Sequence, residues 1–180
     1  MAAAAARGVK TVCLHGPESV GKSVLAAQLA AHFETVFVPE YGRTYCEQFG
    51  TDLDNAALLD IARTQAAMAE SAAPNANRLL ILDTDPLMTA VWSDMMLGCR
   101  DPWFTAFDNY ADLYLLPDID LPWVDDGTRI YGDAVTRNDF FNRCKGELEA
   151  RKVNWALISG KEKARTNAAL AAIARAFPEI

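Results

Sequence analysis

Short apolar runs alternate along the chain with longer stretches in which apolar residues recur at every third or fourth position. The short runs have the length and composition of buried strands and lie at 10–15, 35–40, 78–85, 112–117 and 154–159. The longer stretches have the periodicity of amphipathic helices and lie at 22–33, 55–73, 88–98, 138–150 and 163–177. Strands and helices that alternate in this way form a parallel sheet. The pattern therefore predicts an α/β fold in which helices cover both faces of a five-stranded parallel sheet.

The size and composition of the chain fit one globular domain. It has 180 residues, of which 51% are hydrophobic and 23% are charged, and such a composition is typical of globular domains. A chain of this length buries roughly two-thirds of the surface that it exposes when unfolded. We therefore expect a single domain over residues 1–180, in which the alanine-rich residues 1–8 form a leader before the first strand.

The charge balance and the apolar runs argue against several classes of partner. The chain carries 17 basic and 24 acidic residues, a formal charge of −7, which disfavours a nucleic-acid backbone as the main ligand. No uncharged apolar run approaches ~18 residues, and the first residues lack the apolar core of a secretory signal. The four cysteines form no CxxC pair, so neither a zinc site nor a disulfide framework is indicated. We expect a cytoplasmic protein that binds neither nucleic acid nor membranes.

The segment GPESVGKS at 16–23 matches the phosphate-binding loop motif G-x-x-x-x-G-K-[ST]. A predicted strand precedes it and a predicted helix follows it, which is the context that the motif requires. The glycines allow backbone N–H groups to point inward around phosphates, and the helix N-terminus adds partial positive charge. A simple strand-to-helix turn would not need the complete motif. We expect ATP to contact Gly16, Pro17, Glu18, Ser19, Val20, Gly21, Lys22, Ser23 and Val24.

Two side chains of this loop have separate expected roles. Lys22 would contact the β- and γ-phosphates of ATP, where it would also act in catalysis, and the Ser23 hydroxyl would bind Mg²⁺. The motif thus indicates a protein that binds a nucleoside triphosphate with Mg²⁺, and it leaves the phosphoryl acceptor open.

Two carboxylates, Asp83 and Asp85, follow the third predicted strand. Asp83 comes directly after the apolar run and is the expected magnesium partner. Asp85 stands two residues on, so in an extended chain it would project to the same side as Asp83 and face the acceptor, as a candidate base. In the alternative, Asp85 caps the helix that opens at Pro86, because Asp before a first-turn proline is a common helix start.

The second predicted strand ends in VPEYGR, so Glu40, Tyr41 and Arg43 fall beyond its carboxyl end. Ligands of open parallel sheets bind at that edge, and we expect these three residues to contact the acceptor. Glu40 would take the proton of the attacking hydroxyl, while Arg43 would stabilise developing charge. In the alternative, Glu40 and Arg43 cap the next helix or pair with each other at the surface.

Residues 117–135 contain proline, glycine and many charges and are long for a connector, so we expect a lid. Trp123 offers an aromatic face to a cationic ring. Asp125 and Asp126 suit sugar hydroxyls or a positively charged ligand. Arg129 and Arg137 suit a triphosphate when the lid closes and excludes water, Arg129 as a catalytic residue. In the alternative, the charged residues are merely solvated and the tryptophan belongs to the core.

These motifs, in this order and at these separations, resemble the ribosylnicotinamide kinase domain of the bifunctional bacterial NadR-type proteins of NAD salvage. The resemblance rests on GPESVGKS, EYGR, DTD and WVDDGTR and runs from about residue 10 to the last predicted helix. It implies a P-loop kinase of the nucleoside-kinase type. The implied reaction is the ATP-dependent phosphorylation of the 5′-hydroxyl of nicotinamide riboside, which gives nicotinamide mononucleotide.

The resemblance also implies site residues. Carried over by position, it assigns the phosphate and magnesium contacts, the acceptor contacts and the lid to Lys22, Ser23, Asp83, Glu40, Arg43, Trp123, Asp126 and Arg129. Glu40 and Asp85 remain rivals for the base.

Two other functions fit the same motifs. One is a kinase of another nucleoside or small alcohol, and the other is a regulatory P-loop ATPase module. The sequence has no NKxD motif for guanine, and 159–165 is a candidate for the base-binding loop by position alone. It carries no signal for the oligomeric state.

Overall fold

The computed structural model describes residues 8–180, so all but the last residue of the predicted leader lies outside the described residues. The strands are β1 (Lys10–Leu14), β2 (Phe37–Val38), β3 (Leu79–Leu82), β4 (Leu113–Pro117) and β5 (Trp155–Ile158). Each lies within a predicted run. β2 is shorter than its run because Pro39 has no N–H group to continue the ladder.

The helices are α2 (Lys22–His32), α3 (Tyr41–Phe49), α4 (Asn55–Ala72), α5 (Pro86–Leu97), α6 (Pro102–Ala106), α7 (Ala134–Arg151) and α8 (Glu162–Ala176), and α4 continues into the 3₁₀ turn η1 (Ala73–Asn75). Sequence reasoning missed α3 and α6. α3 has 9 residues and buries none of them, and α6 has only 5 residues. None of the helices in residues 8–180 has the length and apolar character to span a membrane.

The last two residues of the segment predicted as a lid, 134 and 135, belong to α7. The Asp133 side chain accepts a hydrogen bond from the backbone N–H of Thr136 at 2.9 Å, which is a helix N-cap. α7 therefore starts at Ala134, and the segment between β4 and α7 runs over 118–133.

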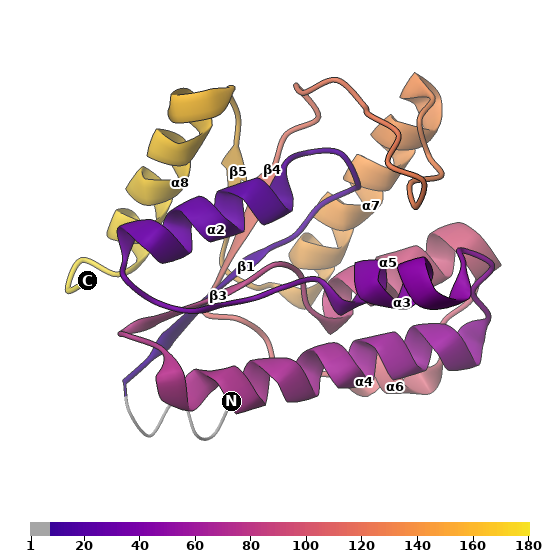
Figure 1. Cartoon of the computed structure of the whole chain (residues 1–180), viewed down its shortest axis with the longest axis horizontal. Helices are drawn as coiled ribbons and strands as arrows, with labels where there is room; N and C mark the ends of the chain where they lie inside the picture. The colour runs from indigo at the N-terminus through magenta and orange to yellow at the C-terminus, as the bar shows by residue number, and fades with distance from the viewer. Residues whose placement is uncertain (1–7) are drawn as a thin grey trace.

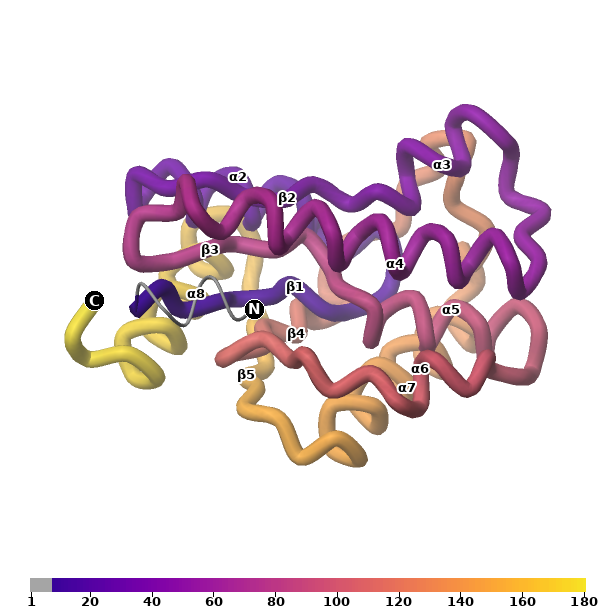
Figure 2. The backbone as a smooth tube through the Cα atoms, turned by 90° about the horizontal axis from the view of Figure 1, so that it is seen from below, coloured from indigo at the N-terminus to yellow at the C-terminus, as the bar shows by residue number. Residues whose placement is uncertain are grey.

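All five strands are parallel and lie in the order β2-β3-β1-β4-β5. This confirms the predicted five-stranded parallel sheet. Figure 2 shows α4 running alongside β2 and β3 and on past α5. Because the strands share one direction, the loops that follow β1, β2, β3 and β4 lie at the same edge of the sheet.

The two faces of the sheet bury separate clusters, as predicted for helices on both sides (Figure 1). Val12, Leu14 and Ile81 pack with α2 and α8, while Cys13, Leu82 and Tyr114 pack with α5 and α7. Neighbouring residues of each strand thus point to opposite faces, as the pleat requires. Both faces are apolar, and this is why the strands read as continuous apolar runs.

A side chain joins β1 and β4 where the two strands begin. The Asp112 carboxylate accepts hydrogen bonds from the backbone N–H of Thr11 at 2.8 Å and from its hydroxyl at 3.0 Å. The Thr11 hydroxyl in turn accepts a bond from the Asp112 N–H at 3.0 Å. Thr11 is fully buried, so its polar groups depend on this carboxylate.

We predict that Asp112→Ala lowers the free energy of unfolding by about 1–3 kcal/mol, because it leaves the buried groups of Thr11 without acceptors. Urea denaturation followed by circular dichroism measures the change. Asp108→Ala, at an exposed position nearby, is the control and should change the midpoint little. Equal midpoints for the two variants would contradict the prediction.

Candidate functional site

The loop between β1 and α2 has the conformation that the phosphate-binding motif predicts. Gly21 has φ of 78°, in the left-handed region that glycine tolerates, and it caps α2. A Cβ atom on Gly16 would lie 3.3 Å from Leu116 Cδ1. Larger residues at these two positions would strain or crowd the loop, so the motif glycines are a steric requirement of this fold.

The Lys22 ammonium lies within this loop. Lys22 is buried, and its Nζ donates hydrogen bonds to the carbonyl oxygens of Gly16 at 2.9 Å and Pro17 at 2.8 Å. The loop therefore holds a buried positive charge beside the N-terminus of α2, which favours a polyanionic ligand.

The strand-end acid Asp83 lies beside Ser23. It is 1% exposed, and its Oδ1 has no hydrogen-bond partner. Burial raises the pKa of Asp83 above its ordinary value, while the Lys22 charge and a hydrogen bond with Ser23 lower it. A buried carboxylate oxygen without a partner is costly unless a cation or donor reaches it.

These oxygen ligands fit Mg²⁺. Magnesium is usually held by one or two protein oxygens together with phosphate oxygens and water, and the Ser23 hydroxyl and the Asp83 carboxylate are such a pair. Within residues 8–180 no group of three or more His, Cys, Asp or Glu side chains forms a metal site. A magnesium ion here would complete its coordination with the nucleotide.

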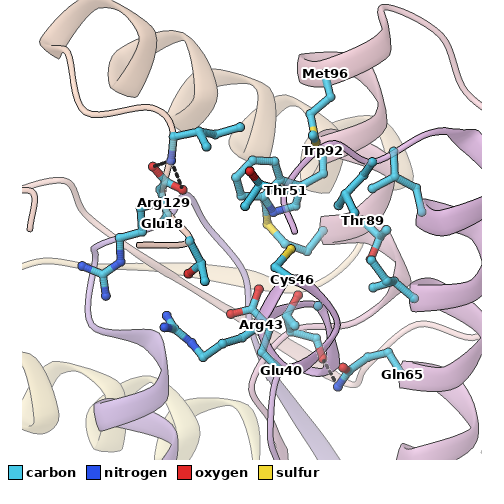
Figure 3. A pocket seen from close by; sticks show the side chains of 18 residues that line it. Glu18, Glu40, Arg43, Cys46, Thr51, Gln65, Thr89, Trp92, Met96 and Arg129 are labelled. Atoms are coloured by element: carbon cyan, nitrogen blue, oxygen red, sulfur yellow. Dashed lines mark hydrogen bonds between the residues drawn. The ribbon is translucent and has the colours of Figure 1, made fainter. Parts of the chain in front are cut away.

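A cavity that is partly open to solvent lies beside the phosphate loop. Its walls come from the loop after β2, from α3, α4 and α5, and from the lid (Figure 3). They are formed by Glu18, Glu40, Gly42, Arg43, Cys46, Thr51, Leu53, Leu58, Ile61, Gln65, Thr84, Met88, Thr89, Trp92, Met96, Thr128, Arg129 and Ile130. The cavity is mostly apolar, with charged groups gathered at its phosphate-loop end.

The cavity continues into a groove along the phosphate loop. The groove is partly open to solvent and is lined by residues 18–24. Five residues line both the groove and the cavity: Glu18, Glu40, Arg43, Trp92 and Arg129. Two carboxylates, two guanidinium groups and an indole ring therefore lie between a phosphate site and a second, apolar site.

Glu40 occupies the N-cap position of α3, but its side chain makes no capping hydrogen bond. The carboxylate points into the cavity instead (Figure 3). Burial raises its pKa, the Lys22 charge opposes the increase, and the Asp83 carboxylate adds to it. A carboxylate with a raised pKa that faces a cavity has the properties of a general base.

Asp126 joins α3 to the lid. Its carboxylate lies 2.7 Å from Arg43 Nη1 and 2.9 Å from Arg129 Nε. Burial raises the pKa of Asp126, but the hydrogen bonds from Arg43 and Thr128 outweigh it and hold the pKa well below its usual range. The expected acceptor contact of Asp126 is thus replaced by ion pairs that position two arginines. The alternative in which Arg43 pairs with Glu40 is not what the structure shows.

The structure places Trp123 away from the cavity, which corrects the expected stacking face. Its indole N–H donates to Glu18 at 3.1 Å. The same carboxylate accepts the backbone N–H groups of Ile130 at 3.0 Å and Tyr131 at 2.7 Å. Ser19 Oγ also accepts the Val124 N–H at 2.9 Å. Trp123 therefore attaches the lid to the phosphate loop, because its indole N–H is hydrogen-bonded to the Glu18 carboxylate.

Three further residues that were predicted to contact a ligand lie outside the groove and the cavity. Arg137 donates to the Leu121 carbonyl at 3.1 Å and does not line the groove. Asp125 is exposed and accepts the Gly127 N–H at 2.9 Å in a local turn. Tyr41 packs edge-on against Tyr45, with ring centroids 6.3 Å apart, and does not line the cavity.

Asp85 does not face the acceptor cavity. Its Oδ1 accepts the Leu87 N–H at 3.1 Å and its Oδ2 accepts the Tyr114 hydroxyl at 2.5 Å. Thr84 has φ of 87°, so the chain between Asp83 and Asp85 is not extended and the two side chains separate. Burial raises the pKa of Asp85 to about 6. Asp85 is the N-cap of α5, as in the alternative in which it caps the helix that opens at Pro86.

Sequence reasoning missed the residues that helices contribute to the cavity. Met88, Trp92 and Met96 recur at every fourth position of α5 and line one wall. The Trp92 ring also stacks on Tyr131 of the lid, with centroids 5.6 Å apart. The four-residue spacing was visible, but it is equally typical of a core-facing helix.

The base-binding candidate 159–165 lies next to the phosphate loop. Arg165 is buried, forms an ion pair with Asp120, and donates to the carbonyls of Val20 and of Gly160, the latter at 2.7 Å. This arginine therefore ties the start of α8 to the phosphate loop.

Comparison with curated proteins identifies relatives over most of the chain. The trifunctional NAD biosynthesis/regulator protein NadR of Escherichia coli (strain K12) is 33% identical over 160 residues, which cover 86% of this chain and 39% of that protein. The protein of the same description from Salmonella typhimurium is 36% identical over 156 residues, covering 83% and 38%. The predicted resemblance is confirmed, and the chain spans about two-fifths of the length of these relatives.

Solved structures share the fold. A crystal structure of NadR protein in complex with NR has a TM-score of 0.81 at 23% identity and covers 96% of this chain and 52% of that one. Thymidylate kinase from Ehrlichia chaffeensis has a TM-score of 0.67 at 14% identity, covering 92% and 97%. At these identities the likeness establishes the P-loop α/β fold.

The sequence profile of one family matches residues 11–165, from β1 through the phosphate loop and lid to α8. This range contains every residue that the groove and the cavity share. The chain belongs to the AAA domain family.

Proposed function

We propose that this chain is a cytoplasmic, ATP-dependent kinase domain that phosphorylates the 5′-hydroxyl of nicotinamide riboside and gives nicotinamide mononucleotide. The observation that carries the proposal is that Glu40, Arg43 and Arg129 line both the phosphate groove and the adjoining cavity. A phosphoryl donor in the groove and an alcohol in the cavity would meet at Glu40.

The relatives support the choice of substrate. NadR proteins are described by their part in NAD biosynthesis. One NadR crystal structure contains NR, the abbreviation of nicotinamide riboside, and another contains NAD and AMP-PNP, an ATP analogue. Because the chain spans 39% of the Escherichia coli relative, the proposal concerns the kinase step alone.

In the proposed reaction, the acceptor hydroxyl attacks the γ-phosphorus while the bond from this phosphorus to the oxygen that bridges it to the β-phosphate breaks. Glu40 accepts the hydroxyl proton. Lys22 and Arg129 neutralise the charge that develops on the transferred phosphoryl group and on the leaving diphosphate. Asp85 takes no part, because Tyr114 and the N-terminus of α5 already occupy its oxygens.

Ser23 and Asp83 would hold the magnesium ion. When bound, the ion would neutralise phosphate charge and fix the orientation of the triphosphate. The buried, unpaired Oδ1 of Asp83 is the feature of this chain that supports the assignment.

The apolar part of the cavity suits the base of the acceptor. Trp92 offers its ring to a positively charged pyridinium, which is the role that the sequence suggested for Trp123. Thr51, Thr89 and Thr128 line the same space, and their hydroxyls would provide hydrogen bonds for a sugar.

A coupled assay of ADP release tests the proposal, with nicotinamide riboside, thymidine or no acceptor. We expect ADP release to depend on nicotinamide riboside and nicotinamide mononucleotide to form in equal amount. Dependence on thymidine alone would indicate another nucleoside kinase. Hydrolysis that is indifferent to any acceptor would indicate an ATPase module.

We predict that Lys22→Ala lowers kcat by about 10²–10³-fold, because the variant loses a charge that stabilises the transition state. Steady-state kinetics at saturating ATP measure the change. Lys145→Ala is the control, since Lys145 pairs with Glu149 on the exposed side of α7, and it should retain full activity. Similar kcat values for both variants would remove Lys22 from the mechanism.

Trp92→Ala should raise the KM for nicotinamide riboside by about 2- to 30-fold, which corresponds to about 0.5–2 kcal/mol of cation–π interaction. The KM for ATP should stay within about twofold. Trp92→Phe keeps an aromatic face and should recover part of the affinity. If the KM for the riboside is unchanged in Trp92→Ala, the ring does not bind at this wall.

The raised pKa of Glu40 predicts the acid limb of the pH–kcat profile. The base acts only when deprotonated, so kcat should fall as pH drops through a pKa above that of an ordinary glutamate. Glu40→Gln should lower kcat by about 10²–10⁴-fold and remove this limb. A limb that persists unchanged in Glu40→Gln would belong to another group.

A further inference from the structure

Gln65 is a buried polar residue in an otherwise apolar helix face. It lies on α4 with Leu58, Ile61 and Ala62, and it is 2% exposed. A glutamine is rarely buried to this extent without a hydrogen-bonding role. Its side chain reaches the floor of the cavity beside Glu40 (Figure 3).

The Gln65 amide contacts both backbone neighbours of Glu40. Its Oε1 accepts the Tyr41 N–H at 2.7 Å, and its Nε2 donates to the Pro39 carbonyl at 3.2 Å. The partners fix the orientation of the amide, since an N–H group needs an acceptor and a carbonyl needs a donor. The peptide segment that carries Glu40 is thus held from both sides.

The same amide reaches the loop that carries Asp83. Its Nε2 donates a longer bond, 3.4 Å, to the carbonyl oxygen of Thr84. Thr84 has φ of 87°, a conformation that side chains other than glycine adopt at a cost. The bond from Gln65 helps to hold this turn and therefore the position of the carboxylate that precedes it.

From this geometry we infer that Gln65 is a positioning residue that fixes the proposed base Glu40 relative to the proposed magnesium ligand Asp83. The inference rests on the proposed function for the roles of these two carboxylates. One planar amide joins the loops after β2 and β3, which are neighbouring strands that pair only over Phe37–Val38. The last backbone bond between them runs from the Asp83 N–H to the Val38 carbonyl at 2.8 Å, so the ladder fixes the backbone at Asp83 and does not reach Glu40.

Positioning of this kind should appear in kcat rather than in KM. Gln65 lines the cavity floor, but its amide is engaged by the Tyr41 N–H and by the Pro39 and Thr84 carbonyls. Its loss should therefore affect transfer, which requires the base, the phosphorus and the metal ligand in one geometry, more than binding. A displacement of about 1 Å from a productive geometry can cost about 10²-fold in rate.

Three variants test the inference in the whole chain. Gln65→Met keeps the unbranched shape and removes all three hydrogen bonds. Gln65→Glu keeps an acceptor for the Tyr41 N–H and loses the donor to the two carbonyls. Met68→Ala is the matched control, because Met68 lies on the same helix, packs against the core and does not line the cavity.

We expect Gln65→Met and Gln65→Glu to lower kcat by about 10- to 100-fold while each KM stays within about threefold. Met68→Ala should leave kcat within about twofold of the wild type even if its Tm falls as much as the Tm of the Gln65 variants. An unchanged kcat in both Gln65 variants would overturn the inference. It would also be overturned if Met68→Ala, with a Tm lowered to the same value, lost as much kcat as the Gln65 variants.

A second readout does not depend on the acceptor. Amide hydrogen exchange at Tyr41 should accelerate in Gln65→Met, and a crystal structure of that variant should show Glu40 displaced relative to Asp83. If the wild type fails to phosphorylate nicotinamide riboside, the proposed function is wrong, and this structural readout alone decides the role of Gln65. Unchanged exchange and unchanged carboxylate positions would show that Gln65 holds neither loop.

Discussion

The parallel direction of all five strands is the constraint on which the rest of the structure depends. Successive parallel strands need a crossover connection, usually a helix, that returns the chain to the edge where the previous strand began, so all strands end at the same edge of the sheet. The phosphate loop follows β1, Glu40 follows β2, Asp83 follows β3 and the lid follows β4. Four segments far apart in the sequence are thereby brought to one edge of the sheet, where the Glu18 carboxylate and the Gln65 amide join them.

Much of this was predictable from the sequence because the signals are local. The apolar runs identify the strands, and GPESVGKS carries its own conformational requirement in Gly16 and Gly21. Asp83 follows from its place directly after an apolar run. Helix α3 escaped prediction because it has only 9 residues and buries none of them, although Tyr41, Tyr45 and Phe49 recur at every fourth position and their rings touch.

The errors share one cause, which is that the direction of a side chain depends on backbone angles and on partners distant in the sequence. Asp85 was expected beside Asp83, but the positive φ of Thr84 separates the two. Trp123 was expected on the cavity, but Glu18, 105 residues away, holds its N–H group. Trp92 lies on the cavity wall in place of Trp123. The four-residue spacing of Trp92 from its apolar neighbours in α5 does not distinguish a ring that faces a ligand from a ring in the core.

Glu18 and Ser19 occupy variable positions of the phosphate-binding motif, where the motif itself demands no particular side chain. In this chain they hold Trp123, Val124, Ile130 and Tyr131. A chimera that received the equivalent loop of another kinase would keep the glycines and the lysine yet release the segment over the cavity. In this protein the phosphate-binding loop is therefore not freely interchangeable with the loop of another kinase, because its Glu18 and Ser19 also hold the lid.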